Sequence, residues 1–192
     1  MTPFTTVTAR TAVLDRADVD TDQIIPARFL RKPRSVGYGT FLFHDLMAVR
    51  DAVLGAGVLF VGANFGCGSS REGAVYALVD AGVRCIVAPS FGDIFAGNAG
   101  KNGLLLVTSS LETTAAMRRT LGAGGTVTVD LPNQVIEGVA GLALPFEIEP
   151  FQKRLLTEGL DEVELTLSHA AALAEWHRHD GSERPWAVPS GR

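Results

Sequence analysis

Three short apolar runs with helix-length segments between them constrain the fold most strongly. The runs lie at residues 58–63, 83–88 and 104–107 and are rich in valine, leucine and isoleucine. Apolar residues at helical spacing fill 74–79, between the first two runs, and 91–98 has the pattern of a short helix between the second and third. Strands that alternate with helices in this way predict a parallel sheet with crossover helices.

The segments on either side extend this core. Residues 6–14 have the pattern of two short strands or one bent strand. Alternating residues on both sides of Pro132 and Asn133 predict a hairpin over 126–139, and 144–148 predicts one more strand. Helices are expected at residues 27–30, 40–53, 111–121, 150–158 and 165–178. The predicted class is α/β, with a mostly parallel central sheet flanked by helices, a C-terminal β-hairpin and C-terminal helices.

Length and composition are compatible with one large domain or two small ones. The chain has 192 residues, of which 46% are hydrophobic and 20% are charged. Such a chain can bury a substantial core. We expect residues 1–179 to form a single domain. Residues 180–192, which contain serine, glycine and proline, are expected to form a flexible polar tail.

Charge and hydropathy argue against several classes of partner. The net charge is −4 with both signs interspersed, so neither a nucleic acid nor an anionic membrane is expected as a partner. The apolar stretches are shorter than the roughly 20 residues of a membrane span. The N-terminus lacks a basic region followed by an apolar one, so no signal peptide is expected and the predicted location is cytoplasmic.

Cysteine and histidine are too few to predict a metal site. Cys67 and Cys85 are the two cysteines, and the sequence has no C-x-x-C. Two thiols alone do not supply the ligands of a usual iron–sulfur cluster. The pair His177 and His179 is compatible with a metal site, but a solvated pair in a polar tail is the favoured interpretation.

The loop after the first apolar run is the candidate functional site. It reads NFGCGSSRE over residues 64–72, where a strand gives way to a helix. Unpaired N–H groups and the dipole of a helix N-terminus favour an anion, and arginine suits a carboxylate. The loop lacks the lysine of a phosphate-binding loop, the third glycine of a dinucleotide fingerprint and the glycine spacing of a nucleophile elbow.

Two roles are open for Ser69. Its oxygen can act as a base if a positive, dehydrated site stabilises the alkoxide. Alternatively, Ser69 and Glu72 match the capping-box pattern, in which the serine does no more than cap a helix.

Two charged segments lie outside this loop. Residues 15–22 contain four acids and are interpreted as a solvated loop with Asx-turns, because the glycine and glutamate of a calcium loop are missing. Residues 31–39 include Arg31, Lys32 and Arg34. This basic segment is interpreted either as a solvated turn or as a flap that closes over an acidic substrate.

The loop resembles the signature of the aconitase superfamily's swivelling domain, and in particular that of the small subunits of 3-isopropylmalate dehydratase. Further blocks resemble the same family in the same order along most of the chain. They are DVDTDQIIP at 18–26, APSFGDIFAGN at 88–98, FEIEPF at 146–151, GLD at 159–161 and LTLSH at 165–169.

The resemblance implies a fold, a partner and roles for individual residues. It implies a swivelling β/β/α-type domain that pairs with a large subunit as a heterodimer or heterotetramer. No cofactor is expected on this chain, because the four-iron four-sulfur cluster belongs to the large subunit, where iron binds the substrate hydroxyl and a carboxylate as a Lewis acid. Ser69 matches the catalytic base, and Gly68, Ser70 and Arg71 match substrate contacts.

The flap and one helix position depart from the family pattern. Arg31 and Arg34 lie on the flap, where family members read the substrate's side group, but SVG replaces the usual RTG at 35–37. Gly73 stands where histidine is usual. The expected function is a hydro-lyase subunit that interconverts 2-isopropylmalate and 3-isopropylmalate in leucine biosynthesis. The alternatives are a paralogue for another 2-hydroxy diacid, such as a methylmalate or a homocitrate-like acid, and a non-catalytic carboxylate-binding subunit.

Overall fold

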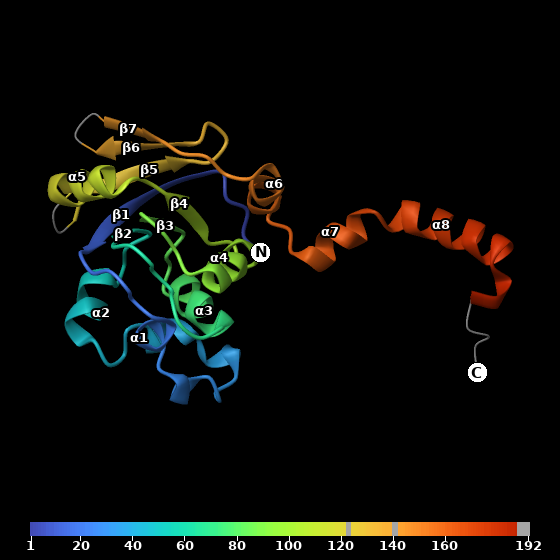
Figure 1. Ribbon diagram of the computed structural model, residues 1–192, viewed down its shortest axis with the longest axis horizontal. Helices are drawn as coiled ribbons and strands as arrows, with labels where there is room; N and C mark the ends of the chain where they lie inside the picture. Colours follow the sequence, from blue (N-terminus) through green and yellow to red (C-terminus); the bar gives the residue numbers. More distant parts are fainter. Residues whose placement is uncertain (122–123, 140–141, 188–192) are drawn as a thin grey trace.

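The computed structural model describes residues 1–121, 124–139 and 142–187. Within them, one seven-stranded sheet forms the centre of the molecule, in the order β4-β3-β2-β1-β5-β6-β7 (Figure 1). The strands are β1 (Thr6–Leu14), β2 (Val58–Val61), β3 (Cys85–Ala88), β4 (Leu105–Thr108), β5 (Thr126–Asp130), β6 (Val135–Val139) and β7 (Leu142–Pro145).

Strand β1 joins two halves of this sheet. Its second half pairs in parallel with β2, from Thr11 opposite Val58 onward, and β2, β3 and β4 continue in parallel. Its first half pairs antiparallel with β5, where Thr6 lies opposite Asp130, and β5, β6 and β7 continue antiparallel. The predicted parallel core and hairpin are therefore confirmed, and residues 6–14 form a single strand.

Helices cover both faces of the sheet. In Figure 1, α1, α2, α3 and α4 lie on one side of the sheet and α5 on the other. The α-helices are α1 (Thr21–Ile24), α2 (Met47–Val53), α3 (Glu72–Asp80), α4 (Asp93–Lys101), α5 (Leu111–Leu121), α6 (Pro150–Glu158), α7 (Glu162–Ser168) and α8 (Ala170–Glu183). Short 3-10 turns are η1 (Ala27–Phe29), η2 (Arg34–Val36), η3 (Tyr38–Phe41) and η4 (Pro185–Ala187).

Strands β2 and β3 are buried on both faces, which explains their continuous apolar sequences. Leu59 and Ile86 face a core shared with α1, α3 and α4. Phe60 and Val87 face a second core on the opposite side of the sheet, to which α5 contributes Met117. Because successive side chains of a strand point to opposite faces, a four-residue strand such as β2 contributes to both cores.

Several segments differ from the sequence-based expectation. The single helix expected at 165–178 is divided into α7 and α8, and the strand expected at 144–148 is β7, which ends at Pro145. The helix expected at 40–53 begins only at Met47, because Leu42 and Phe43 are buried in the core with no exposed surface. Phe43 adopts a left-handed backbone with φ of 46°, and its N–H donates to the Ile24 carbonyl oxygen at 2.8 Å. The acidic segment 15–22, expected to be a solvated loop, ends in α1, whose N-cap Asp20 forms a capping box with Gln23.

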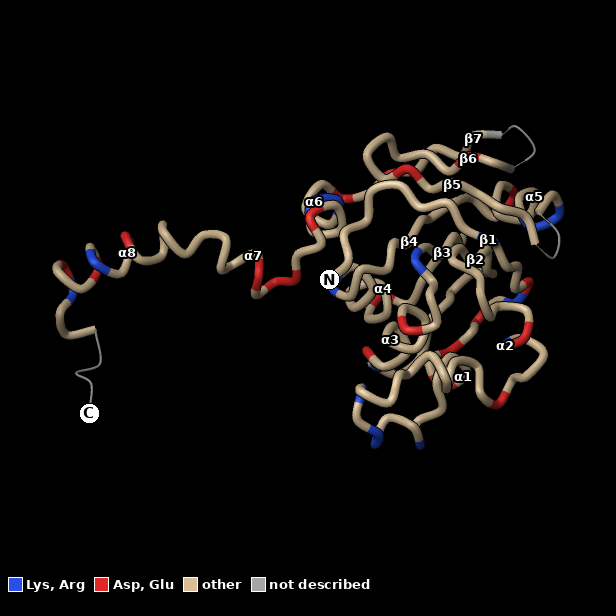
Figure 2. The backbone as a smooth tube through the Cα atoms, turned by 180° about the vertical axis from the view of Figure 1, so that it is seen from behind, with Lys and Arg blue, Asp and Glu red and all other residues tan. Residues whose placement is uncertain are grey.

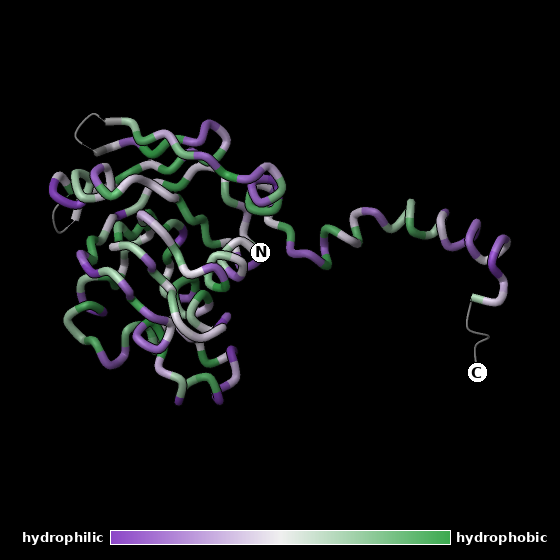
Figure 3. Tube along the Cα trace, viewed as in Figure 1, coloured by the Kyte–Doolittle hydropathy of each residue, from purple (hydrophilic) through white to green (hydrophobic). Residues whose placement is uncertain are grey.

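The C-terminal helices extend away from the body of the molecule. Helices α7 and α8 form an arm in Figure 1, and Figure 3 shows polar and apolar residues mixed along it. None of the described residues of these two helices is buried. Helix α8 continues through Glu183, and residues 188–192 lie outside the described part of the chain. Among the described helices, none combines the length and the apolar character needed to span a membrane.

Candidate active site

The candidate loop lies beside a second loop at the carboxyl ends of the parallel strands. The N–H of Phe65 donates to the Ser90 carbonyl oxygen at 3.2 Å, and the Gly92 N–H donates to the Phe65 carbonyl oxygen at 3.0 Å. A hollow of about 270 Å³ between the loops is lined by Asn64, Gly66, Cys67, Gly68, Gly92, Asp93 and Ile94. The two loops are therefore neighbours and line one hollow, as the sequence predicts, at the position where parallel sheets bind ligands. Of the predicted site residues, Gly68 is among those that line the hollow, whereas Ser69, Ser70 and Arg71 are not.

Gly66 makes the sharp turn at the start of this loop. Its φ is 76°, and a Cβ atom there would lie 2.3 Å from the ring of Phe95. Its N–H also donates to the Val19 carbonyl oxygen at 2.7 Å. A side chain at this position would therefore be strained in its backbone and would collide with α4.

Ser69 and Ser70 are exposed, and Ser69 does not cap the helix. Helix α3 begins at Glu72, its N-cap is Arg71, and no side chain accepts a capping hydrogen bond there. The carboxylate of Glu72 instead accepts a hydrogen bond from Asn102 Nδ2 at 2.9 Å. The capping-box interpretation of Ser69 is therefore wrong, and its hydroxyl is available for another role.

Arg71 forms an ion pair with Asp22 at the N-terminus of α3. The Arg71 side chain is 16% exposed and that of Asp22 is 54% exposed. Nη1 of Arg71 lies in direct contact with the Asp22 carboxylate. The hydrogen bond and charge of Arg71 hold the pKa of Asp22 below its usual value, against the opposing effect of partial burial. Guanidinium and helix dipole together favour an anion here.

The segment 20–22 is a part of the site that the sequence-based interpretation missed. Thr21 is 2% exposed, its N–H donates to the Cys67 carbonyl oxygen and its hydroxyl to the Ser69 carbonyl oxygen, both at 3.0 Å. The contacts join residues about 50 positions apart, so no local pattern reveals them. The resemblance of 18–26 to a family block was the available signal.

Arg34 lies away from the loop, toward the other end of α3. The guanidinium of Arg34 stacks on the ring of Tyr76, 3.7 Å from its centroid, and lies 3.6 Å from Asp80. Asp80 is the last residue of α3, which is roughly 13 Å long at 1.5 Å per residue. Arg31 is exposed. Figure 2 shows the basic segment 31–34 at the edge of the body opposite β6 and β7.

Gly73 is buried in the first turn of α3. A Cβ atom there would lie 2.5 Å from Leu30 Cδ2 and 3.4 Å from the ring of Tyr38. The side chain of Leu30 therefore fills the space in front of this position.

The thiols do not fit an iron–sulfur cluster. Cys85 is fully buried in β3, and burial raises the pKa of its thiol. Cys67 lies in the loop, where burial and the charges of Asp20 and Asp18 raise its pKa. Across residues 1–121, 124–139 and 142–187, no group of three or more histidine, cysteine, aspartate or glutamate residues could hold a metal ion. His177 and His179 lie on exposed α8.

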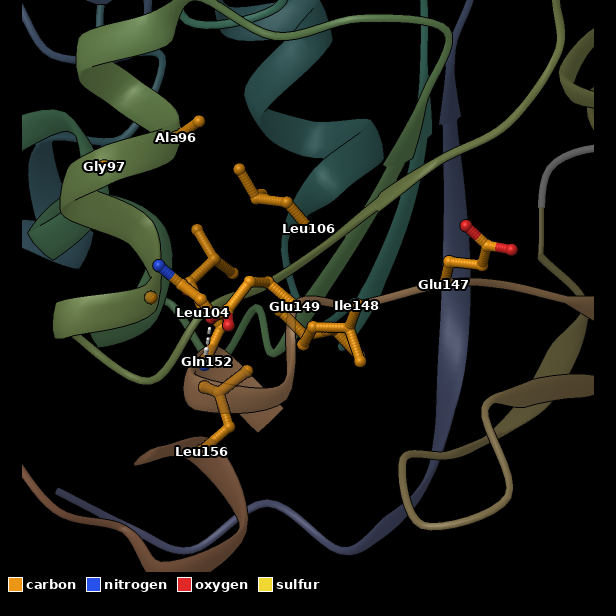
Figure 4. Close-up of a pocket in the computed structure, with 11 residues that line it drawn as sticks. Ala96, Gly97, Leu104, Leu106, Glu147, Ile148, Glu149, Gln152 and Leu156 are labelled. Atoms are coloured by element: carbon orange, nitrogen blue, oxygen red, sulfur yellow. Dashed lines mark hydrogen bonds between the residues drawn. The ribbon is translucent and has the colours of Figure 1, made fainter. Parts of the chain in front are cut away.

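A second hollow shares no lining residue with the one at the loop. It has a volume of about 360 Å³ and lies where α4, β4 and α6 meet (Figure 4). Gln152 reaches from α6 toward Gly100 of α4, where a Cβ atom would lie 2.0 Å from its Oε1. This hollow contains none of the residues expected to act in the chemistry.

Comparison with known proteins identifies the family. The model of the aconitase C-terminal domain matches residues 52–112, which include the candidate loop. A 3-isopropylmalate dehydratase small subunit from Xanthobacter autotrophicus is 42% identical, over 97% of this chain and 100% of the relative. The chain belongs to the 3-isopropylmalate dehydratase small subunit family. The small subunit from Leptospira interrogans is 41% identical, over 97% of this chain and 98% of its own.

A solved structure from the family agrees with the fold. The crystal structure of a 3-isopropylmalate dehydratase from Methanocaldococcus jannaschii has a TM-score of 0.72 and 27% sequence identity. The match covers 88% of this chain and 98% of the other. The expected fold class, including its mostly parallel core and flanking helices, is therefore confirmed.

Proposed function

We propose that the chain is the small subunit of a heteromeric hydro-lyase that interconverts 2-isopropylmalate and 3-isopropylmalate in leucine biosynthesis. One observation carries the proposal: Ser69 and Arg71 precede α3 in a chain of which 97% aligns with a named dehydratase small subunit. No observation favours another 2-hydroxy diacid or a non-catalytic subunit.

Arg71 and its neighbours supply the binding part of the site. The partly buried guanidinium, held by Asp22, is suited to a substrate carboxylate. Ser70 and the backbone of Gly68 are proposed to add hydrogen bonds to the same substrate. Arg31 and Arg34 are proposed to contact the substrate's side group from the flap, which requires Arg34 to leave Tyr76 and Asp80.

Ser69 supplies the base. Dehydration removes a proton from the carbon next to the hydroxyl-bearing carbon, and the electron pair of that C–H bond forms the alkene as hydroxide departs. Ser69 Oγ takes the proton, and it returns a proton to the alkene in the reverse step. Ser69 is exposed in this chain, so the role requires a partner that covers the loop and excludes water. In that setting the charge of Arg71 and the N-terminus of α3 stabilise the alkoxide.

The remaining parts of the enzyme are proposed to lie on a partner. Because the described residues do not fit an iron–sulfur cluster, we place the four-iron four-sulfur cluster on a large subunit. The assembly is proposed to be a heterodimer or heterotetramer in the cytoplasm. Residues 1–179 are proposed to act in it as one swivelling domain.

Reconstitution tests this assignment. The purified chain alone is expected to be inactive, and anaerobic mixing with the family's large subunit and its assembled cluster is expected to produce dehydratase activity on 2-isopropylmalate. Matched assays with a methylmalate and a homocitrate-like acid test the substrate. Turnover by the lone chain, or a reconstituted complex that prefers another acid, contradicts the proposal.

A further inference from the structure

A short segment at the start of α1 lies directly against the catalytic loop. Thr21 contributes two contacts: its N–H donates to the Cys67 carbonyl oxygen and its Oγ1 donates to the Ser69 carbonyl oxygen, both at 3.0 Å. Asp20 forms a parallel bridge with Cys67 at the same edge. The backbone of the proposed base is thus tied to a different element of the fold.

The next residue of this segment contacts the proposed substrate clamp. The carboxylate of Asp22 pairs with Nη1 of Arg71, whose side chain is 16% exposed. A partly buried guanidinium loses part of its hydration, and a carboxylate at contact distance offsets that loss. Asp22 itself stays 54% exposed, so it is not buried together with its partner.

Helix α1 is a firm support for these contacts. Asp20 Oδ1 accepts from the Gln23 N–H at 2.7 Å, and Gln23 Oε1 accepts from the Asp20 N–H at 3.2 Å. Ile24 and Ile25 follow with no exposed surface, so the helix is anchored in the core. A capped and anchored turn holds its side chains in place better than a free loop would.

We propose that Thr21 and Asp22 are positioning residues for the dehydration reaction. Thr21 fixes the backbone of Ser69 and thereby the position of the base. Asp22 fixes the guanidinium of Arg71 where the substrate carboxylate binds. This inference rests on the proposed function, because it assigns both residues to the site of that reaction, but the contacts themselves are independent of it.

Amide hydrogen exchange of the isolated chain tests the contacts without any activity. Thr21→Val removes the hydroxyl at nearly constant shape, and Asp22→Asn removes the charge. Both variants are expected to speed exchange of amides in residues 64–71 by about 10-fold or more. Asp15→Asn is the matched control, because it breaks an Asp–Arg pair of 2.8 Å with Arg118 of α5 instead. Unchanged exchange in both test variants overturns the inference.

Kinetics of the reconstituted complex test the two roles separately. Asp22→Asn is expected to raise KM about 10- to 100-fold with little change in kcat, because it disturbs the carboxylate clamp. Thr21→Val is expected to lower kcat about 3- to 10-fold with KM nearly constant, because it displaces the base. Asp22→Glu, which keeps the charge, is expected to recover part of the loss in KM.

The outcomes distinguish this inference from the proposed function. If the wild-type complex is inactive, the proposed function fails, and hydrogen exchange still decides the positioning role. If the wild-type complex is active but both variants keep normal KM and kcat per folded molecule, the positioning role is overturned. A loss of activity that merely follows the loss of folded protein overturns it as well.

Discussion

Gly92, the N-cap of α4, lies against the backbone of Gly66 in the candidate loop. A Cβ atom at position 92 would lie 2.6 Å from the Gly66 carbonyl oxygen and 3.0 Å from Cys67 Cα. These are backbone atoms, so they cannot rotate away as the end of a side chain can. The two loops that line the candidate site can therefore approach one another only with glycine at this position.

Gly92→Ala is expected to destabilise the chain by about 1–3 kcal/mol, because the added methyl group forces the loops apart. Urea unfolding measures the change. Gly97→Ala on the same helix is the matched control, since a Cβ there has nothing within 4 Å and alanine favours a helix by up to about 1 kcal/mol. A Gly92→Ala variant as stable as the wild type would show that the two loops can move apart without a loss of stability.

Ser69→Ala is expected to separate chemistry from stability. Since Ser69 is exposed and does not cap α3, the free energy of unfolding of the variant should differ from that of the wild type by less than about 0.5 kcal/mol. The kcat of the reconstituted complex should fall by about 10²- to 10⁴-fold, because the base is lost.

Ser110→Ala is the contrasting variant for Ser69→Ala. Ser110 Oγ accepts from the Thr113 N–H at 3.0 Å in front of α5, so its loss should cost about 1 kcal/mol without affecting kcat. A reversed pattern, with Ser69→Ala unstable and active, would restore the capping role.

The pair of Asp22 and Arg71 predicts an acid-sensitive contribution to stability. The folded-state pKa of Asp22 lies below its ordinary value of 3.8, chiefly because Arg71 donates to its carboxylate. The contribution is thus fully present above pH 3.8 and is lost as the pH falls through the lower folded-state pKa. The difference in Tm between wild type and Asp22→Asn should shrink below about pH 4. A constant difference from pH 7 to pH 3 would contradict this linkage.

Leu30 and Gly73 are expected to be energetically coupled. Gly73→Ala gains helix propensity of up to about 1 kcal/mol, but its Cβ meets Leu30 Cδ2. The gain should therefore appear in a Leu30→Ala background and be reduced or reversed in the wild type. A double-mutant cycle by thermal unfolding measures the coupling, and additive effects would show that Leu30 moves aside freely.

Truncation after Leu160 should leave the body folded. Helices α7 and α8 bury none of their described residues, so their removal should change the free energy of unfolding by less than about 0.5 kcal/mol. Truncation after Glu149 is the control, since it removes Leu155 and Leu156 of α6, which are 3% and 2% exposed. Loss of cooperative unfolding in the shorter deletion would show that the arm supports the body.

The parts of the fold that depend on local chemistry were predictable. Helices α5 and α6 have the bounds that the sequence indicates, because amphipathic spacing in α5 and Pro150 at the first position of α6 are local signals. Strands β2, β3 and β4 were located from apolar runs, since both faces of β2 and β3 and one face of β4 are buried. The shared position of the two loops followed from the parallel topology.

The parts that depend on distant contacts were not predictable from local patterns. The acids of 15–22 resemble a solvated loop until Arg71 is placed beside Asp22. The spacing of 40–53 resembles a helix, but the left-handed backbone at Phe43 serves a contact with Ile24. The sequence places Arg34 in a basic flap, but its contact with the ring of Tyr76, 42 positions away, could not be predicted from a local pattern.

The double pairing of β1 has a consequence for the order in which the chain can fold during its synthesis. Its second half can pair with β2 once residue 61 has been made. Its first half must wait for β5, because Thr6 lies opposite Asp130. In a nascent chain the first half of β1 thus has no strand partner while nearly 70 more residues, including the whole candidate loop, are synthesised.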